Sequence, residues 1–124
     1  MISVSIIIPV YNEENTILLI LKKIKEKINE LKNNINFEII IVDDHSTDST
    51  KKLLKENTHL YNLLIENIHN KGKGFSVNKG VQSSSNEIIL IQDADLEYLP
   101  ENYENLLKPF IYSDADVVYG SRFR

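Results

Sequence analysis

Two aspartates one residue apart, Asp93 and Asp95, follow an apolar stretch and are the residues of this chain best suited to chemistry. The stretch, residues 87–92, shows no alternation of apolar and polar side chains, a pattern typical of a strand buried on both faces of a parallel sheet. Open α/β sheets bind ligands at the carboxyl ends of their strands. Carboxylates there suit Mg²⁺ or Mn²⁺, which commonly bridges a few carboxylates to a substrate's phosphates. The pattern therefore predicts a site for a metal ion and a diphosphate.

A second Asp-x-Asp pair, Asp114 and Asp116, shows that this spacing is a weak signal by itself. Aspartate is common in turns, and this pair precedes the apolar residues 117–119. In a parallel strand the pair would lie at the opposite edge of the sheet from Asp93 and Asp95. We therefore predict that Asp114 and Asp116 are loop residues, and that position relative to the strand distinguishes the two pairs.

Size and composition limit the classes of protein to which the chain can belong. With 124 residues it is expected to form one domain, residues 1–124, and its net charge of −4 without a basic stripe argues against nucleic acid as a partner. The absence of cysteine excludes a disulfide scaffold and a Cys-based zinc site, and is compatible with a reducing compartment. No signal peptide and no membrane-spanning run is visible, so we expect a cytoplasmic protein, at most peripheral to the membrane.

Apolar periodicity divides the chain into alternating strands and helices. The expected strands are residues 4–10, 37–42, 62–67, 87–92 and 117–119. The expected helices are residues 17–31, 51–56 and 75–83, and a segment that begins at Pro100. This alternation predicts an α/β fold, a three-layer sandwich with a mainly parallel sheet between helices.

The strand ends favour a nucleotide-linked ligand over a bare phosphate. The turn at residues 9–13 has no glycine, which excludes the dinucleotide-binding G-x-G-x-x-G turn, and residues 71–74 lack the spacing of a P-loop. Acidic or amide side chains instead follow the first, second and fourth strands. They repel phosphate, but they accept hydrogen bonds from a base or ribose, and a metal ion would admit the diphosphate.

Five motifs in this order resemble family 2 glycosyltransferases, and most closely the dolichol-phosphate and undecaprenyl-phosphate sugar transferases. The motifs are residues 9–13 (PVYNE), 42–50 (VDDHSTDST), 70–74 (NKGKG), 92–98 (QDADLEY) and 120–123 (GSRF). The resemblance implies a GT-A fold and transfer of a sugar from a UDP- or GDP-sugar with inversion at the anomeric carbon. A polyprenyl phosphate at a membrane surface is the implied acceptor.

The resemblance also implies which residues would bind the nucleotide. Pro9, Tyr11 and Glu13 would line its pocket. Asp44, with Asp43 beside it, would hold the base or ribose. Two alternatives stay open at this point: Tyr11 packs beside the first helix, and one of the two aspartates only shapes the turn before the next helix.

The metal and diphosphate would be bound by a second set of residues. Asp93 would face the ribose or the metal, Asp95 would ligate Mg²⁺ or Mn²⁺, and Glu97 would close the metal shell. Lys73 would steady the nucleotide or diphosphate, and Arg122 would contact the phosphate of the donor or acceptor. With the metal, Lys73 would stabilise charge that develops on the leaving diphosphate.

Relatives continue beyond residues 120–123, and that continuation holds most of their acceptor site. The chain is therefore expected to be the donor-binding portion of the fold, truncated at its C-terminal side. An antiparallel strand of the relatives would also be missing, which would leave a sheet edge open to self-association. Two other functions are considered: a nucleotide-sugar binding module without turnover, and a haloacid-dehalogenase-type phosphatase. The phosphatase is disfavoured because Leu96 stands where those enzymes have Thr or Val.

Overall fold

The computed structural model describes residues 2–95, 100–112 and 117–119, and in them a parallel five-stranded sheet. The strands are β1 (Ile2–Val10), β2 (Ile35–Asp43), β3 (Leu63–Glu66), β4 (Ile88–Ile91) and β5 (Val117–Tyr119). The helices are α1 (Ile17–Leu31), α2 (Thr50–Glu56), α3 (Lys73–Ser83) and α4 (Tyr103–Tyr112), with short 3₁₀ turns η1 (Thr58–Leu60) and η2 (Pro100–Asn102). The predicted α/β class, with a parallel sheet between helices, is confirmed.

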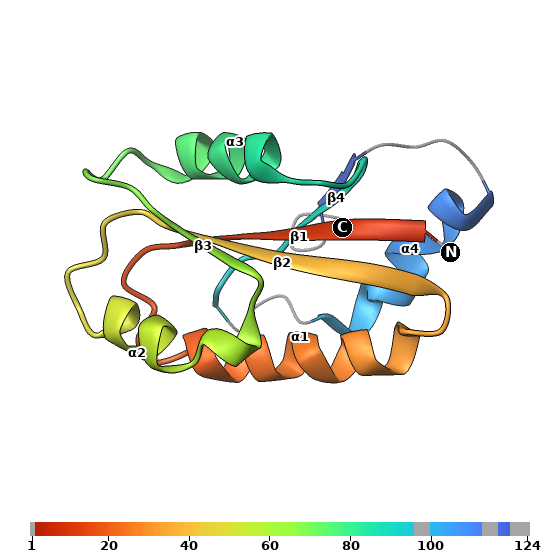
Figure 1. Ribbon diagram of the computed structural model, residues 1–124, viewed down its shortest axis with the longest axis horizontal. Helices are drawn as coiled ribbons and strands as arrows, with labels where there is room; N and C mark the ends of the chain where they lie inside the picture. Colours follow the sequence, from red (N-terminus) through yellow and green to blue (C-terminus); the bar gives the residue numbers. More distant parts are fainter. Residues whose placement is uncertain (1, 96–99, 113–116, 120–124) are drawn as a thin grey trace.

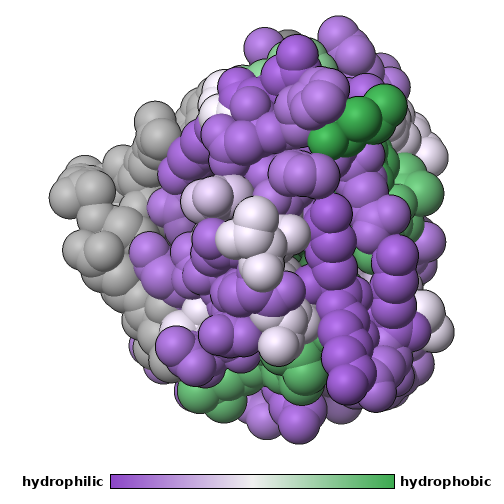
Figure 2. Space-filling view, turned by 90° about the vertical axis from the view of Figure 1, so that its left-hand side faces the viewer, coloured by the Kyte–Doolittle hydropathy of each residue, from purple (hydrophilic) through white to green (hydrophobic). Residues whose placement is uncertain are grey.

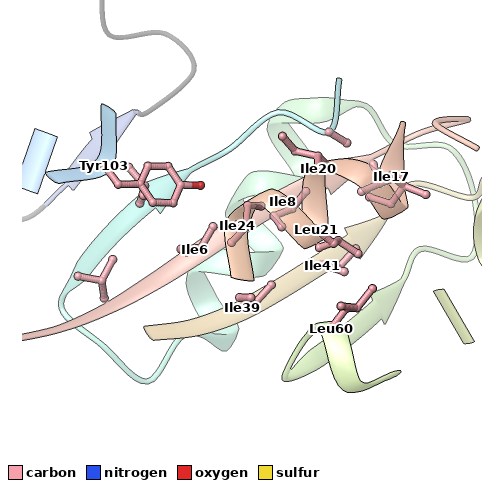
Figure 3. Close-up of a cluster of buried hydrophobic side chains, with 14 of the residues drawn as sticks. Ile6, Ile8, Ile17, Ile20, Leu21, Ile24, Ile39, Ile41, Leu60 and Tyr103 are labelled. Carbon is pink, nitrogen blue, oxygen red and sulfur yellow. The ribbon is translucent and has the colours of Figure 1, made fainter. Parts of the chain in front are cut away.

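The sheet lies between two helical layers, with α3 on one face and α1 and α2 on the other (Figure 1). Helix α1 presents apolar residues every three or four positions, so one side of the helix is buried against the sheet. Ile17, Leu21 and Ile24 of the helix belong to one buried cluster with the sheet residues Ile6 and Ile39 (Figure 3). This cluster is the larger part of the core and fixes the α1 layer.

The opposite face of the sheet packs closely against α3. Ile7, Ile40 and Val42 are buried there, and the helix contributes Val77. Gly80 permits the close approach, because a Cβ atom at that position would lie 2.5 Å from Cγ2 of Ile7. The close packing fixes the position of α3 and therefore of its first residues, which lie at the carboxyl edge of the sheet.

The strand order β3-β2-β1-β4-β5 creates a crevice at the carboxyl edge between β1 and β4. The chain proceeds from β1 outward to β2 and β3, and α3 then returns it to β4 on the other side of β1. Strands β1 and β4 are therefore neighbours although they are far apart in the sequence, and their carboxyl ends point to the left in Figure 1. Ligands of open α/β sheets bind at such a switch point.

The structure differs from the sequence-based expectations at several boundaries. Helix α3 begins at Lys73, so this residue and Gly74 belong to its first turn and not to the preceding loop. Strand β5 pairs directly with β4 in parallel, so the outer strands of the described sheet are β3 and β5. Self-association through a sheet edge stays a prediction. In the part of the chain that the structure describes, no helix is long and apolar enough to cross a membrane.

Candidate functional site

A pocket of about 330 Å³ opens at the carboxyl edge of the sheet, at the switch point between β1 and β4. Its lining residues are Pro9, Val10, Tyr11, Glu13, Asp44, Lys73, Ser76, Asp93, Ala94 and Asp95. The surface at this end of the molecule is predominantly hydrophilic (Figure 2). The structure thus brings to one pocket residues from the ends of β1, β2 and β4 and from the first turn of α3. Tyr11 is 45% exposed at this pocket, so it is not buried against the first helix.

Asp43 lies beneath the pocket and does not line it. Its side chain is fully buried, and Oδ1 accepts a hydrogen bond of 2.5 Å from the Ser46 hydroxyl while Oδ2 accepts one of 3.2 Å from the Ser46 backbone N–H. These bonds close the turn after β2, in which His45 has a φ of 62°. Of the two adjacent aspartates, Asp43 is therefore the one that shapes the turn.

Asp44 lines the pocket and also holds the loop that leads to α3. Its Oδ1 accepts hydrogen bonds from the Lys71 N–H at 2.7 Å and the Asn67 side-chain amide at 2.8 Å, and its Oδ2 accepts one from the Gly72 N–H at 2.8 Å. Burial by itself would raise the pKa of Asp44, but these bonds stabilise the anion and lower the pKa overall. The carboxylate therefore clamps the residue 67–72 loop against the end of β2.

The loop after β1 is tied to the loop after β2 through Asn12. This residue has a φ of 51°, and its Oδ1 accepts hydrogen bonds from the backbone N–H groups of Thr47 and Asp48 at 2.7 and 3.3 Å. Its own N–H donates to the Ser46 hydroxyl at 2.9 Å. Thr16 is the N-cap residue of α1, and Asn12 bonds to the neighbouring loop instead of capping the helix.

Buried polar contacts position the segment after β4. Gln92 is buried; its Oε1 accepts a hydrogen bond of 2.7 Å from the Tyr103 hydroxyl, and its amide donates to the Asp93 carbonyl at 3.1 Å. Because Tyr103 is also buried against the α1 face, this link connects α4 to the backbone of Asp93. Burial raises the pKa of Tyr103 well above its usual value, so its hydroxyl remains a donor at neutral pH.

Three acidic side chains lie near one another in the pocket. Burial is the main cause of a raised pKa at Glu13, and the negative charges of Asp95 and Asp93 contribute to it. The hydroxyl of Thr16, which donates to Glu13 at 3.2 Å, partly opposes the shift. We call Glu13, Asp93 and Asp95 the acidic cluster. The raised pKa means that the ionised form of Glu13 is disfavoured, and the charge of a bound cation would favour it again.

Among the described residues that line the pocket, Lys73 is the basic one. Its ammonium group forms an ion pair with Oδ1 of Asp93 and lies at the start of α3, directly after the clamped loop. Gly72 has a φ of 93°, a backbone conformation that other residues rarely adopt, and this turn directs the chain into the helix at Lys73.

The donor set suits a hard divalent cation. Among the described residues, no group of three or more His, Cys, Asp and Glu side chains is close enough to hold a metal ion without further ligands. Asp93 and Asp95 nevertheless share one pocket, and Mg²⁺ is commonly bound through one or two carboxylates together with water and substrate phosphates. The side chains therefore fit a cation that arrives with a phosphorylated ligand. Glu97 and Arg122 lie outside the described residues, as do Asp114 and Asp116.

Sequence reasoning missed two polar residues beside the pocket, Ser76 and Asn67. Both are buried, and the Asn67 amide donates to the Ser76 hydroxyl at 3.0 Å as well as to Asp44. Ser76 could have been found from its position one helical turn after Lys73. No local sequence signal identifies Asn67, since its partners come from β2 and α3.

The chain matches a known protein family over nearly its whole length. The model of the family described as Glycosyl transferase family 2 matches residues 5–124. The dolichol-phosphate mannosyltransferase of Pyrococcus furiosus is 32% identical over 121 residues, which is 97% of this chain and 33% of that protein. The chain thus spans about a third of the length of that relative.

Two solved structures share the fold and contain ligands. A mannosyltransferase from Pyrobaculum calidifontis, in complex with GDP-Man and Mn²⁺, has a TM-score of 0.65 and 31% identity; the match covers 77% of this chain and 28% of that one. S. aureus TarS residues 1–349, in complex with UDP-GlcNAc, has a TM-score of 0.68 and 28% identity; the match covers 84% of this chain and 30% of that one.

Proposed function

Because the chain belongs to glycosyl transferase family 2 and has the GT-A fold, we propose that its pocket binds the diphosphate of a UDP- or GDP-sugar through a divalent cation. The observation that carries the proposal is the convergence of Glu13, Asp44, Lys73, Asp93 and Asp95 on one pocket at the switch point. Acidic strand ends that would repel a bare diphosphate become a binding site once a cation lies between them and the phosphates.

Each residue of the pocket has a role in this proposal. Asp95, with Asp93, holds Mg²⁺ or Mn²⁺. Asp44, which lines the pocket beside the clamped loop, accepts a hydrogen bond from the base or ribose. Pro9 and Tyr11 form the wall against which the nucleoside rests. The bound cation would offset negative charge that develops on the leaving diphosphate.

The reaction we propose is transfer of the sugar with inversion to a polyprenyl phosphate at a membrane surface. The support is the similarity to a protein named dolichol-phosphate mannosyltransferase, of which this chain spans about a third. Similar structures contain UDP-GlcNAc in one case and GDP-Man in the other, and the proposal therefore covers both nucleotides.

A thermal-shift panel of UDP- and GDP-sugars, each with and without Mn²⁺, tests the proposal. We expect a rise in melting temperature only where a nucleotide sugar and Mn²⁺ are both present, and we expect Asp95→Asn to remove it. Glu87→Gln is the matched control, because it removes the same charge just before the amino end of β4, far from the pocket. Stabilisation that persists without Mn²⁺, or in Asp95→Asn, would contradict the proposal.

A further inference from the structure

The ion pair between Lys73 and Asp93 places an ammonium group beside one of the two carboxylates that we propose as metal ligands. Both side chains line the pocket; that of Lys73 is 39% exposed and that of Asp93 is 17% exposed. An ammonium group and a divalent cation repel each other at the separation that sharing one carboxylate would impose. A cation that binds Asp93 must therefore displace Lys73 or bind against its charge.

The fold positions Lys73 for this contact. Asp44 clamps the two residues before it, through hydrogen bonds from the N–H groups of Lys71 and Gly72. Gly80 holds the same helix close to the sheet at Ile7. The backbone of Lys73 is thus fixed at both sides, while its long side chain retains the freedom to move within the open pocket.

We infer that Lys73 is the resident counter-ion of Asp93, and that a nucleoside diphosphate transfers it from Asp93 to the phosphates as the divalent cation binds. Free Mn²⁺ then binds weakly, because the positive charge of Lys73 beside Asp93 opposes the cation and occupies one of its carboxylate ligands. The diphosphate removes that opposition by offering phosphate oxygens to the ammonium group. Metal and nucleotide binding are therefore coupled, and the coupling is reciprocal. The inference rests on the proposed function and assigns the coupling to one side chain.

Neighbouring lysines offer a matched control. The Nζ atoms of Lys71 and Lys79 lie 6.0 and 5.6 Å from the ring centroid of Phe75, on the outside of α3. Neither residue lines the pocket. Lys71→Met therefore removes a positive charge two residues from Lys73 and leaves the ion pair with Asp93 intact. Its backbone N–H, which donates to Asp44, is also retained.

The first experiment is a titration of Mn²⁺ alone, followed by the electron paramagnetic resonance signal of the free ion. We expect Lys73→Met to bind Mn²⁺ about tenfold more tightly than the unmutated chain, on the basis of removing one nearby charge from a partly solvated site. Lys73→Arg and Lys71→Met should stay within about twofold of the unmutated chain, since both retain a cation beside Asp93. Equal affinities in Lys73→Met and the unmutated chain would overturn the inference, and so would no Mn²⁺ binding in Lys73→Met.

The second experiment repeats the titration with saturating UDP and, separately, GDP. We expect the nucleotide that binds to raise the Mn²⁺ affinity of the unmutated chain, and to raise that of Lys73→Met by a smaller factor. An equal factor in both proteins would overturn the inference. If neither nucleotide affects any protein, the proposed function fails, whereas the titration of Mn²⁺ alone still decides whether Lys73 opposes the free cation.

Discussion

The two pairs of neighbouring aspartates at the carboxyl edge of the sheet differ in what surrounds them. Asp43 and Asp44, at the carboxyl end of β2, are surrounded by donors: the Ser46 hydroxyl and backbone amides of the turn and of the residue 67–72 loop. Asp93 and Asp95, after β4, lie near Glu13 in a pocket, where Lys73 forms an ion pair with Asp93. We call the first pair the turn pair and the second the pocket pair.

The difference shows how one residue type serves structure in one place and ligand binding in another. A carboxylate that accepts hydrogen bonds from the protein's own donors stabilises the fold, as Asp43 does, whereas Asp44 combines such bonds with a place in the pocket wall. Glu13 lies near the negative charges of Asp95 and Asp93, which oppose its ionisation, and a bound cation would relieve that repulsion. We therefore expect substitutions of Asp43 to affect stability first, and substitutions of Asp95 to affect binding first.

The largest expected effect is on folding, at Asp43. Asp43→Ala should lower the free energy of unfolding by about 2–4 kcal/mol, because it leaves the buried donors of Ser46 without an acceptor. Urea unfolding followed by circular dichroism measures the loss. Asp95→Ala serves as the comparison and should change stability by less than about 0.5 kcal/mol. Equal losses in the two variants would remove the distinction between the pairs.

An intermediate effect is expected on nucleotide binding, and its pattern separates Asp44 from Asp95. Asp44→Ala should weaken binding of the nucleoside monophosphate as well as the diphosphate, because the lost contact is to the base or ribose. Asp95→Asn should weaken only the metal-dependent binding of the diphosphate, by about tenfold or more. Calorimetry with UMP, UDP, GMP and GDP compares the two. If Asp44→Ala affects only the diphosphate, Asp44 belongs with the metal site.

The smallest expected effect is a difference in the pH dependence of stability. The pKa of Asp44 is lowered in the folded protein, so its ionised form contributes stability at neutral pH that is lost as pH falls through and below its usual value of 3.8. The pKa of Glu13 is raised, so any stability it contributes is present below its usual value of 4.5 and is lost as pH rises through the folded value.

Two variants reveal these opposite signs. Asp44→Asn should reduce stability at pH 7 and have a smaller effect in acid, whereas Glu13→Gln should increase stability at pH 7 relative to acid. Both variants preserve the size of the side chain. Melting temperatures of both variants and of the unmutated chain, measured from pH 3 to pH 7, give the comparison. If the two substitutions change the melting temperature in the same direction as pH rises, Asp44 and Glu13 do not differ in this way.

Much of the fold could be predicted from the sequence, because apolar periodicity is a local property. The helix at residues 17–31 and the buried strands before Asp43 and Asp93 follow from side-chain spacing alone. The family resemblance and the GT-A fold are confirmed by the comparisons. The residues expected at the nucleotide site also meet at one pocket wherever they are described, with the exception of Asp43.

The different roles of the adjacent residues Asp43 and Asp44 could not be predicted, because the role of Asp44 depends on hydrogen-bond partners that are distant in sequence. Asp44 accepts hydrogen bonds from the N–H groups of Lys71 and Gly72, which are 27 and 28 positions away, and no local sequence pattern predicts such contacts. The pairing of Lys73 with Asp93 likewise depends on how closely α3 packs against the sheet at Gly80. The start of α3 was also predicted two residues too late, because the helix follows Gly72 and not Gly74.

The central claim is that a divalent cation joins the pocket pair to a nucleoside diphosphate. Isothermal titration calorimetry of UDP and of GDP with the unmutated chain tests that claim most directly. Each nucleotide is titrated once with Mn²⁺ present and once with EDTA in place of Mn²⁺. We predict that at least one of the two nucleotides binds with Mn²⁺ and that its binding is lost in EDTA. Equal affinity in EDTA would contradict the account, because the acidic cluster would then accept the diphosphate without a cation.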